Sequence, residues 1–232
     1  MNTTKELRIL KVEDGGASEK TDPVAVEQTL HIYVNGQHHT ILAATPQYLE
    51  ELALGHLFSA GIIRNLADVD TLTTDADFRT IWVETVRCEV QPAPVSDGLR
   101  VLLTDILFNM EQFLHKSAVF FATGAVHSCA LIVDGRMMHF MEDIGRHNAL
   151  DKTFGAALRG STHLDRAVVL TSGRIHSDMM IKVIHSRSQV VVSRSAPTDA
   201  AVELALRYNV TMCGFARGNQ LNIYTGRHRI LV

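Results

Sequence analysis

Apolar and polar residues alternate over short stretches near the start of the chain, a pattern typical of strands with one buried face. Residues 29–34 alternate in this way, and residues 40–42 continue the pattern after a break at Asn35-Gly36. Asn-Gly tolerates the two positive φ angles of a type I′ turn, so these residues predict a β-hairpin. Residues 1–24 are mostly polar and show no apolar period, which predicts a flexible N-terminal tail.

A helical pattern follows this hairpin. Thr45-Pro46 offers an N-cap residue and a proline suited to the first helical position. A strand is expected at 80–86, and the prolines within 92–98 withhold backbone donors, which indicates a linker. We therefore expect a smaller α+β domain at 25–95 and a larger domain at 96–232. The apolar positions of the first helix, which runs to Gly61, are Leu49, Leu52, Ala53, Leu57 and Phe58.

The larger domain alternates helix-type and strand-type segments. Continuous apolar runs such as 167–170 are typical of strands that are covered on both faces. Helices packed on a largely continuous sheet are the expected result, which makes the fold class α/β, or α+β over the whole chain. The expected strands are 126–133, 137–141, 167–170, 189–193 and 210–214, and the expected helices are 106–114, 149–158, 176–186 and 197–208.

Composition excludes several classes of protein. The chain has 232 residues, of which 46% are hydrophobic and 20% charged, so it can bury a core and is not a disordered chain. Its formal net charge of -3 offers no broad cationic surface for nucleic acid. The first 17 residues contain no apolar run long enough for a signal peptide or a membrane helix, so we expect a cytoplasmic protein without membrane insertion.

Polar residues are most concentrated at 142–152, where an expected strand passes into an expected helix. Gly145 would let a backbone approach a ligand, and a helix start carries free N–H groups that attract anions. Arg146 and Lys152 add positive charge, so a phosphate-bearing ligand would fit. The alternative is a capped helix with a solvated charge network.

Two further loops share this character. Thr171-Ser-Gly-Arg174 follows a buried-type strand, and ligands of open α/β sheets bind at such carboxyl ends. The stretch 214–220 is expected to be a loop between two strands, and its aromatic, guanidinium and amide groups suit a guanine or pterin ring. The alternatives are a plain strand-to-helix turn and a plain hairpin loop.

The three cysteines, Cys88, Cys129 and Cys213, do not form a C-x-x-C pair, and a disulfide framework is not expected. His127 stands two residues before Cys129 and could activate its thiol, but a small buried cysteine is the simpler interpretation. Cys213 also has the neighbours of a core residue. The H-x-E and P-C-x-x-C motifs of a zinc deaminase are absent, and no metal site is predicted.

The string Glu142-Asp-Ile-Gly-Arg-His-Asn-Ala-Leu-Asp-Lys152 resembles the signature of the formate dehydrogenase accessory protein family, FdhD. The resemblance runs from about Val24 to the C-terminus. Further motifs similar to those of the family, in family order, include Thr45-Pro46, Thr123-Gly124, Ser172-Gly-Arg174, Ser195-Ala-Pro-Thr198 and Gly214-Phe-Ala-Arg217.

This resemblance implies a homodimeric, cytoplasmic maturation factor that carries sulfur from a cysteine desulfurase to the molybdenum cofactor of apo-formate dehydrogenase. It implies binding of the bis(molybdopterin guanine dinucleotide) form of that cofactor, and a cytidine deaminase-like fold for the larger domain. The implied cofactor-binding residues are Phe215, Ala216, Arg217, Gly218, Asn219 and Gln220, with Arg146, His147, Lys152, Ser172 and Arg174 as further candidates.

One departure from the family pattern bears on the function. The family's C-x-x-C pair would be expected near 92–103, where this chain has no cysteine, and the nearest thiol is Cys88. A persulfide relay needs an accessible thiol, so no residue can be assigned as catalytic. The alternative is a relative that binds and delivers the cofactor without handling sulfur. A nucleotide hydrolase or deaminase rests on fold analogy alone.

Overall fold

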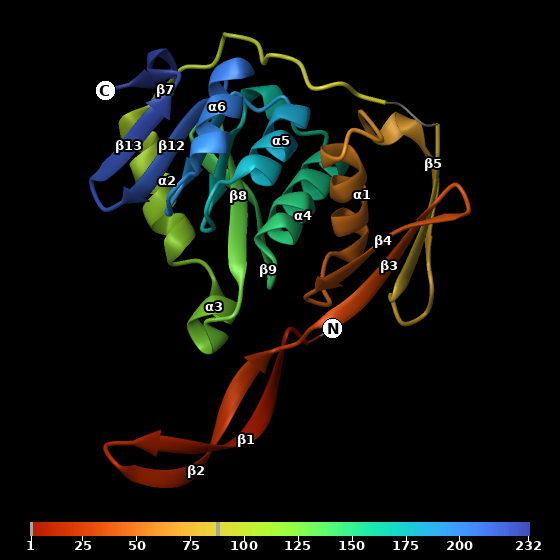
Figure 1. Cartoon of the computed structure of the whole chain (residues 1–232), viewed down its shortest axis with the longest axis vertical. Helices are drawn as coiled ribbons and strands as arrows, with labels where there is room; N and C mark the ends of the chain where they lie inside the picture. Colours follow the sequence, from red (N-terminus) through yellow and green to blue (C-terminus); the bar gives the residue numbers. More distant parts are fainter. Residues whose placement is uncertain (1, 87–88) are drawn as a thin grey trace.

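The computed structural model describes residues 2–86 and 89–232, and it shows a mixed α/β protein with a projecting hairpin (Figure 1). Cys88 lies outside the described residues. The first part of the chain contains β1 (Thr4–Glu13), β2 (Gly16–Ala25), β3 (Gln28–Val34), β4 (Gln37–Ala44), α1 (Leu49–Ser59), β5 (Val69–Thr74) and β6 (Thr80–Thr85). The second part contains β7 (Val101–Leu102), α2 (Leu103–Leu114), α3 (Ala118–Thr123), β8 (His127–Val133), β9 (Arg136–Asp143), α4 (Arg146–Arg159), β10 (Val168–Thr171), α5 (Ser177–His185), β11 (Val190–Ser193), α6 (Asp199–Arg207), β12 (Thr211–Arg217), β13 (Gln220–Thr225) and β14 (Ile230–Leu231).

A six-stranded sheet in the order β13-β12-β11-β10-β8-β9 forms the centre of the second part. Strands β10, β11 and β12 are parallel, and β8 is antiparallel to both β10 and β9. Helices α4, α5 and α6 cover one face and α2 covers the other, which explains the uninterrupted apolar runs of the central strands. Alternate residues of β10 illustrate this, because Val169 faces the first core and Val168 and Leu170 face the second.

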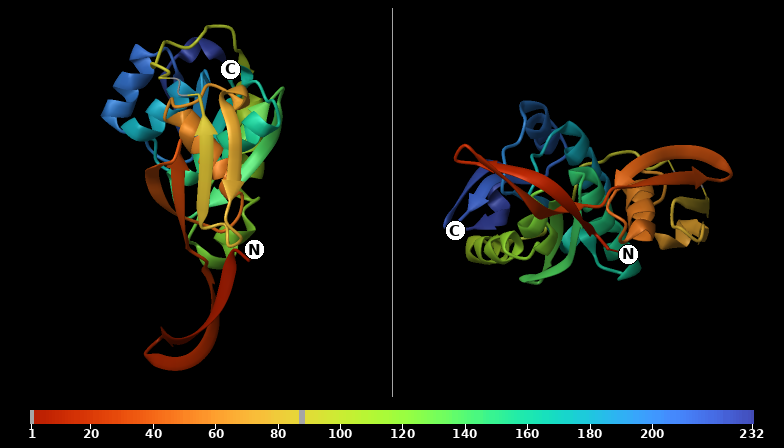
Figure 2. Two further views of the ribbon diagram at one scale, coloured as in Figure 1. Left: turned by 90° about the vertical axis from the view of Figure 1, so that its right-hand side faces the viewer. Right: turned by 90° about the horizontal axis from the view of Figure 1, so that it is seen from below.

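A separate four-stranded sheet, in the order β4-β3-β6-β5, lies beside α1 (Figure 2). The predicted type I′ turn is present, with positive φ at Asn35 and Gly36. One continuous core runs from Leu30 of β3 through α1 to Phe154 of α4 and onward to the central sheet. The two parts therefore have separate sheets but a shared core, and their independence as domains stays a prediction.

Helices α1 and α4 approach each other at two glycines. A Cβ atom on Gly55 would lie 1.7 Å from the carbonyl oxygen of Asp151, and one on Gly155 would lie 1.9 Å from that of Glu51. Only glycine leaves room for backbones this close. These two positions therefore set the distance between the two helices.

The N-terminal region differs from the expectation. Residues 4–25 form the antiparallel hairpin β1–β2 around the turn Asp14-Gly15, rather than a tail without secondary structure. The hairpin extends away from the rest of the chain on the side where α3 lies (Figure 1). Its pattern was missed because a two-stranded arm exposes both faces, so one face need not be apolar.

The start of the first helix was also misplaced. Helix α1 begins at Leu49 and its N-cap is Tyr48, with φ of 56°, not Thr45. The Thr45 hydroxyl instead belongs to a buried polar network with Asp143 and Lys152. None of the helices in the described part of the chain is both long and apolar enough to cross a membrane.

Candidate functional site

One edge of the central sheet collects the predicted polar loops. Strands β9, β10, β11 and β12 end at this edge, and β8 begins there, because β8 runs against its neighbours. The loops after β10 and β11 are tied together: the Ser193 hydroxyl donates to the Gly173 carbonyl at 2.7 Å, and the Ile175 N–H donates to the Ala196 carbonyl at 3.2 Å. As expected for an open α/β sheet, polar side chains converge at the strand ends.

The structure brings four of the predicted residues, Arg146, His147, Ser172 and Arg174, to this edge. A Cβ atom on Gly173 would lie 3.0 Å from the Cβ of Arg146, so this glycine lets the arginine side chain pass close to the β10 loop. The Ser172 hydroxyl accepts from the Ser128 N–H at 2.9 Å. Strand pairing thus joins residues that lie far apart in the sequence.

His127 and His176, which were not among the predicted site residues, lie beside these residues. Together with His147 they form what we call the histidine cluster. Arg146 Nε and Nη2 donate to Nε2 of His176 over 2.9 and 2.6 Å. The rings of His147 and His176 are 4.9 Å apart between centroids, and Nδ1 of His127 is 3.4 Å from the Ser172 hydroxyl. His176 stands 30 residues from Arg146, and no sequence spacing signals this contact.

The pKa values of these three imidazoles are all lowered, which favours their neutral forms. Burial is the main reason that the pKa of His147 falls to about 4, and nearby cations such as Lys182 and Arg146 lower it further. Burial also lowers the pKa of His127, and Arg146 and Arg174 act in the same direction. The pKa of His176 is lowered by burial and then by Arg146. The positive field at this edge therefore comes from guanidinium groups and not from imidazolium.

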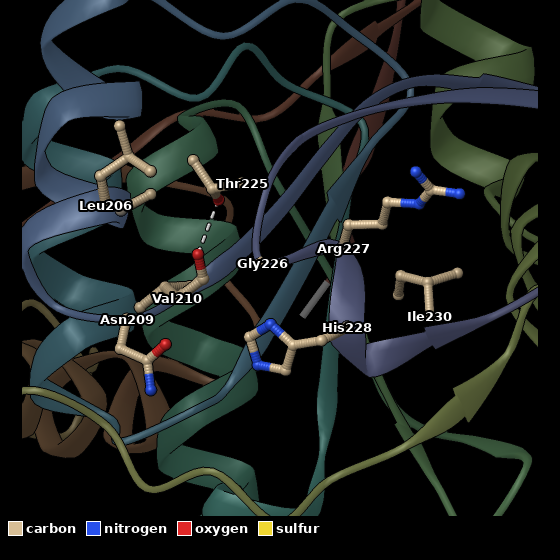
Figure 3. A pocket seen from close by; sticks show the side chains of 9 residues that line it. Leu206, Asn209, Val210, Thr225, Gly226, Arg227, His228 and Ile230 are labelled. Carbon is tan, nitrogen blue, oxygen red and sulfur yellow. Dashed lines mark hydrogen bonds between the residues drawn. The ribbon is translucent and has the colours of Figure 1, made fainter.

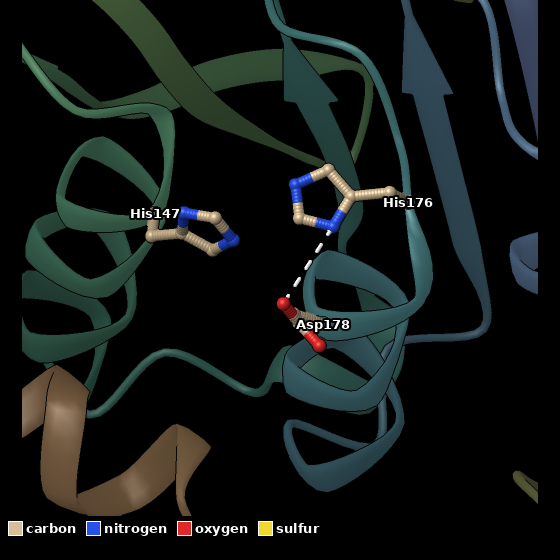
Figure 4. A group of neighbouring side chains, drawn as sticks. All are labelled: His147, His176 and Asp178. Carbon is tan, nitrogen blue, oxygen red and sulfur yellow. Dashed lines mark ion pairs between the residues drawn. The ribbon is translucent and has the colours of Figure 1, made fainter.

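His147, His176 and Asp178 each place one potential ligand atom within 4.8 Å of the others (Figure 4). Two imidazoles and a carboxylate are donors that a transition metal accepts. Arg146, however, already donates to His176 Nε2, and its charge opposes a cation. Nε2 of His147 is buried without a hydrogen-bond partner among the described residues. The arrangement therefore suits an anion or a polar ligand better than a metal ion.

Lys152, predicted as a ligand of the cofactor, has a different role. Its side chain is fully buried and its ammonium lies 2.7 Å from Asp143, 2.7 Å from the Thr45 hydroxyl and 3.1 Å from the Thr45 carbonyl. Asp143 also accepts from the backbone N–H groups of Thr45 and Gly145. All three donors of Lys152 are therefore used internally, and its assignment to the cofactor site stays a prediction.

A second ion pair, between the buried Asp151 and the partly buried Lys182, lies next to the cluster. Lys182 of α5 donates to both Asp151 carboxylate oxygens, at 2.9 and 2.7 Å, and to the Ser59 hydroxyl at 2.8 Å. Ser59 in turn donates to Asp151 at 2.6 Å. These contacts join α1, α4 and α5 behind His147, and sequence reasoning missed them because each helix contributes one member.

The predicted loop at 214–220 is a bulged hairpin. Gly214 to Arg217 belong to β12, the turn is Gly218-Asn219, and β13 begins at Gln220. The register shifts between Gly214 and Arg217, and Phe215 has a positive φ of 54°. The extra length carries the tip beyond the carboxyl ends of β10 and β11, the edge that holds the histidine cluster.

Side-chain exposure divides the six predicted residues of this hairpin. The exposed ones, Arg217, Gly218, Asn219 and Gln220, form its tip, and Phe215 is half-buried. Ala216 is fully buried in the core under α2, so its side chain is not exposed at the tip, and its assignment to the cofactor site stays a prediction. The tip therefore offers one guanidinium and two amide side chains to a ligand.

Both thiols among the described residues are inaccessible. Cys129 and Cys213 are completely buried, and burial raises the pKa of each thiol to about 12. The interpretation of Cys129 as a core residue is confirmed. Its neighbour His127 is paired with Ser172 instead.

A pocket of about 670 Å³ lies at the opposite edge of the sheet (Figure 3). Asn209 and Val210 precede β12, and Gly226, Arg227 and His228 follow β13, so this pocket is at the amino end of β12. It contains none of the predicted site residues.

Comparison with known proteins shows the family of this chain. The family model described as FdhD/NarQ matches residues 25–94 and 85–231. The chain belongs to the FdhD/NarQ family. A "Sulfur carrier protein FdhD" of Listeria monocytogenes is 35% identical, over 99% of this chain and 100% of that protein. A "Protein FdhD" of Methanocaldococcus jannaschii is 32% identical, over 95% and 96% of the two chains.

The FdhD/NarQ fold is also seen in a solved structure. A crystal structure from Desulfotalea psychrophila, described as a formate dehydrogenase accessory protein, superposes with a TM-score of 0.89 at 28% identity. The match covers 99% of this chain and 100% of that one, so it includes the projecting N-terminal hairpin.

Proposed function

We propose that this FdhD/NarQ protein is a maturation factor for formate dehydrogenase that binds the bis(molybdopterin guanine dinucleotide) form of the molybdenum cofactor. In this proposal it carries sulfur from a cysteine desulfurase to the cofactor for an apo-formate dehydrogenase. The names of its relatives support the sulfur carrier and formate dehydrogenase parts. The observation that carries the cofactor part is the donor-rich edge where β9, β10 and β12 end.

The groups at this edge fit an anionic nucleotide cargo. Arg146 and Arg174 supply charge, and the first turn of α4 supplies backbone N–H groups, which together suit phosphate oxygens. His147 lies in the same turn of α4, and its buried Nε2 has no partner among the described residues. Arg217, Asn219 and Gln220 at the hairpin tip suit the edge of a guanine base. We also infer a cytidine deaminase-like architecture for 96–232, supported by the sheet with helices on both faces.

Arg217→Ala is expected to weaken the affinity for GDP, a fragment of the proposed cargo, by more than tenfold. Arg217 is exposed at the hairpin tip and supports no core contact, so the melting temperature should stay nearly unchanged. Isothermal titration calorimetry with GDP measures the effect. Arg227→Ala is the matched control, because Arg227 is an exposed arginine at the opposite edge. Equal affinity of the Arg217 variant and the unaltered protein would contradict the assignment of the tip.

Replacing each cysteine in turn tests whether the protein accepts sulfur, and which thiol accepts it. Incubation with a cysteine desulfurase and cysteine is expected to add the mass of sulfur to the intact protein, and Cys88→Ser should remove that addition. Cys129→Ser and Cys213→Ser should keep it, because both thiols are buried with a raised pKa. Intact-mass spectrometry reads the result, and a C-x-x-C-bearing relative shows that the desulfurase is active.

The outcome separates the two versions of the function. Addition of sulfur that depends on Cys88 supports a sulfur carrier with a single thiol. No addition, with the relative fully modified, would contradict sulfur transfer and leave a protein that binds and delivers the cofactor. The buried state of both described cysteines is the observation that favours this second version.

A further inference from the structure

The Arg146 side chain is held at two points, along its stem and at its guanidinium. The stem crosses Gly173, where an added Cβ would lie 3.0 Å from the Cβ and 3.1 Å from the Cδ of Arg146. The guanidinium donates from Nε and Nη2 to one atom, Nε2 of His176, over 2.9 and 2.6 Å. Glycine therefore leaves room for the path of the stem, and the imidazole fixes where the guanidinium lies.

These two hydrogen bonds leave one end of the guanidinium open. Arginine has five N–H donors in a planar fork, and His176 accepts one from Nε and one from Nη2. The two donors of Nη1 and the second donor of Nη2 form no hydrogen bond within the described part of the chain. These Nη1 and Nη2 donors form an edge that can bind two oxygens of one anionic group side by side. A lysine at this position could not divide its donors in this way, because all three sit on one nitrogen.

The contact also determines the protonation of His176. Arginine has no acceptor, so Nε2 of His176 must accept and carries no proton. The neutral ring then has its proton on Nδ1, the nitrogen that lies 3.9 Å from Oδ2 of Asp178 (Figure 4). Burial, and then Arg146, lower the pKa of His176, although Asp178 raises it. The ring is therefore kept in the form that accepts from Arg146.

The backbone at His176 is fixed on both sides. The preceding residue, Ile175, is fully buried and bonds to the loop after β11 through both its N–H and its carbonyl. The His176 carbonyl accepts from Met180 N–H at 3.0 Å in the first turn of α5. The imidazole itself packs beside His147, with 4.9 Å between ring centroids. His176 is thus a firm support for the Arg146 guanidinium.

We propose that His176 is a positioning residue that holds Arg146 ready for bidentate binding of one phosphate group of the cargo. The inference rests on the proposed function, and it adds the mode of phosphate binding and a residue that acts without touching the ligand. An arginine that is ordered before binding loses less side-chain freedom when the ligand arrives. His176 therefore increases the affinity for phosphate through Arg146 alone.

The affinity for inorganic pyrophosphate, measured by isothermal titration calorimetry near neutral pH, tests the proposal. Arg146→Ala should weaken binding by more than about tenfold, because it removes charged donors. His176→Phe keeps a neutral ring but removes the acceptor, and should weaken binding by about fivefold. His176→Gln should stay within about twofold of the unaltered protein, because its Oε1 can accept in place of Nε2. His163→Phe is the matched control, since His163 is exposed and follows the opposite end of α4.

A double-mutant cycle separates positioning from direct contact with the ligand. In an Arg146→Ala background, His176→Phe should change the pyrophosphate affinity by less than about twofold, because the imidazole no longer has a guanidinium to orient. In an Arg174→Ala background, His176→Phe should keep its full effect, since no hydrogen bond joins Arg174 to His176 among the described residues. Unchanged circular dichroism and melting establish that each variant is folded.

Nitrogen-15 NMR of the unaltered, ligand-free protein tests the orientation itself. A scalar coupling is expected between Arg146 Nε and His176 Nε2 across their hydrogen bond, with the His176 proton on Nδ1. Lack of this coupling, lack of pyrophosphate binding, equal affinity of the His176→Phe variant, or a full effect of His176→Phe without Arg146 would each overturn the proposal. The proposed function fails separately. If pyrophosphate binds in the expected pattern and GDP binds no more tightly, the positioning role is supported and the guanine nucleotide assignment is contradicted.

Discussion

Lys152→Ala is expected to lower the free energy of unfolding by about 3–5 kcal/mol, the range for breaking one partner of a buried ion pair. Both Lys152 and Asp143 are fully buried, with 2.7 Å between ammonium nitrogen and carboxylate oxygen. Removing the lysine leaves the Asp143 charge uncompensated and the Thr45 carbonyl without this donor. Chemical denaturation monitored by circular dichroism measures the change.

Two controls separate this effect from loss of any surface charge. Arg159 pairs with Glu50 and Glu51 at the surface, so Arg159→Ala should cost less than about 1 kcal/mol. Combining Lys152→Met with Asp143→Asn should recover part of the loss, because neither buried side chain is then charged. If Lys152→Ala cost no more than Arg159→Ala, the buried network would not hold β9, α4 and the segment after β4 together.

Gly55→Ala is expected to destabilise the protein by about 3 kcal/mol or more, at the upper end of overpacking effects. The new Cβ would lie 1.7 Å from the carbonyl oxygen of Asp151, so α1 and α4 would have to separate. Asp151 is the carboxylate that holds Lys182 and Ser59, so the separation would also strain that buried pair. Alanine otherwise stabilises a helix relative to glycine. A loss of stability in the Gly55→Ala variant therefore indicates the steric contact between α1 and α4.

Gly98→Ala is the control, because a Cβ at Gly98 meets no atom within 4 Å and its φ is not positive. It should leave the melting temperature nearly unchanged or slightly raised. A Gly55 variant as stable as the Gly98 variant would contradict the close packing of the two helices. Thermal unfolding of both variants under the same conditions makes the comparison.

Much of the fold could be predicted from the sequence because its elements have strong local signals. The hairpin β3–β4 was predicted from alternation and Asn35-Gly36, and the segments for β8 to β12 were close to their observed bounds. The hairpin β1–β2 was missed because both of its faces are exposed. Thr45 was misplaced because its hydroxyl bonds to Asp143 and Lys152 and does not cap the helix.

Part of the candidate site could also be predicted, because its loops have local signals in the sequence. Loops at the carboxyl ends of strands can be recognised in a sequence, so Arg146, Ser172 and Arg174 were expected at the sheet edge where the structure places them. His147 was named only through the family resemblance. The contact of Arg146 with His176 could not be found, because it depends on how the loops after β9 and β10 pack around Gly173. Lys152 has the residue type of a ligand, and its burial is a property of tertiary packing alone.

The sequence by itself determined most strands and helices of the central sheet and its covering layers, the α/β class and the residues available for a polar site, because these follow from local periodicity and residue type. The tertiary structure alone decided which of those residues are exposed and which are buried. Tertiary packing buries Lys152 and Ala216, and it places His147 beside His176. Burial also raises the pKa of Cys129 and Cys213. Side-chain burial depends on contacts between segments far apart in the chain, and no local pattern encodes those contacts.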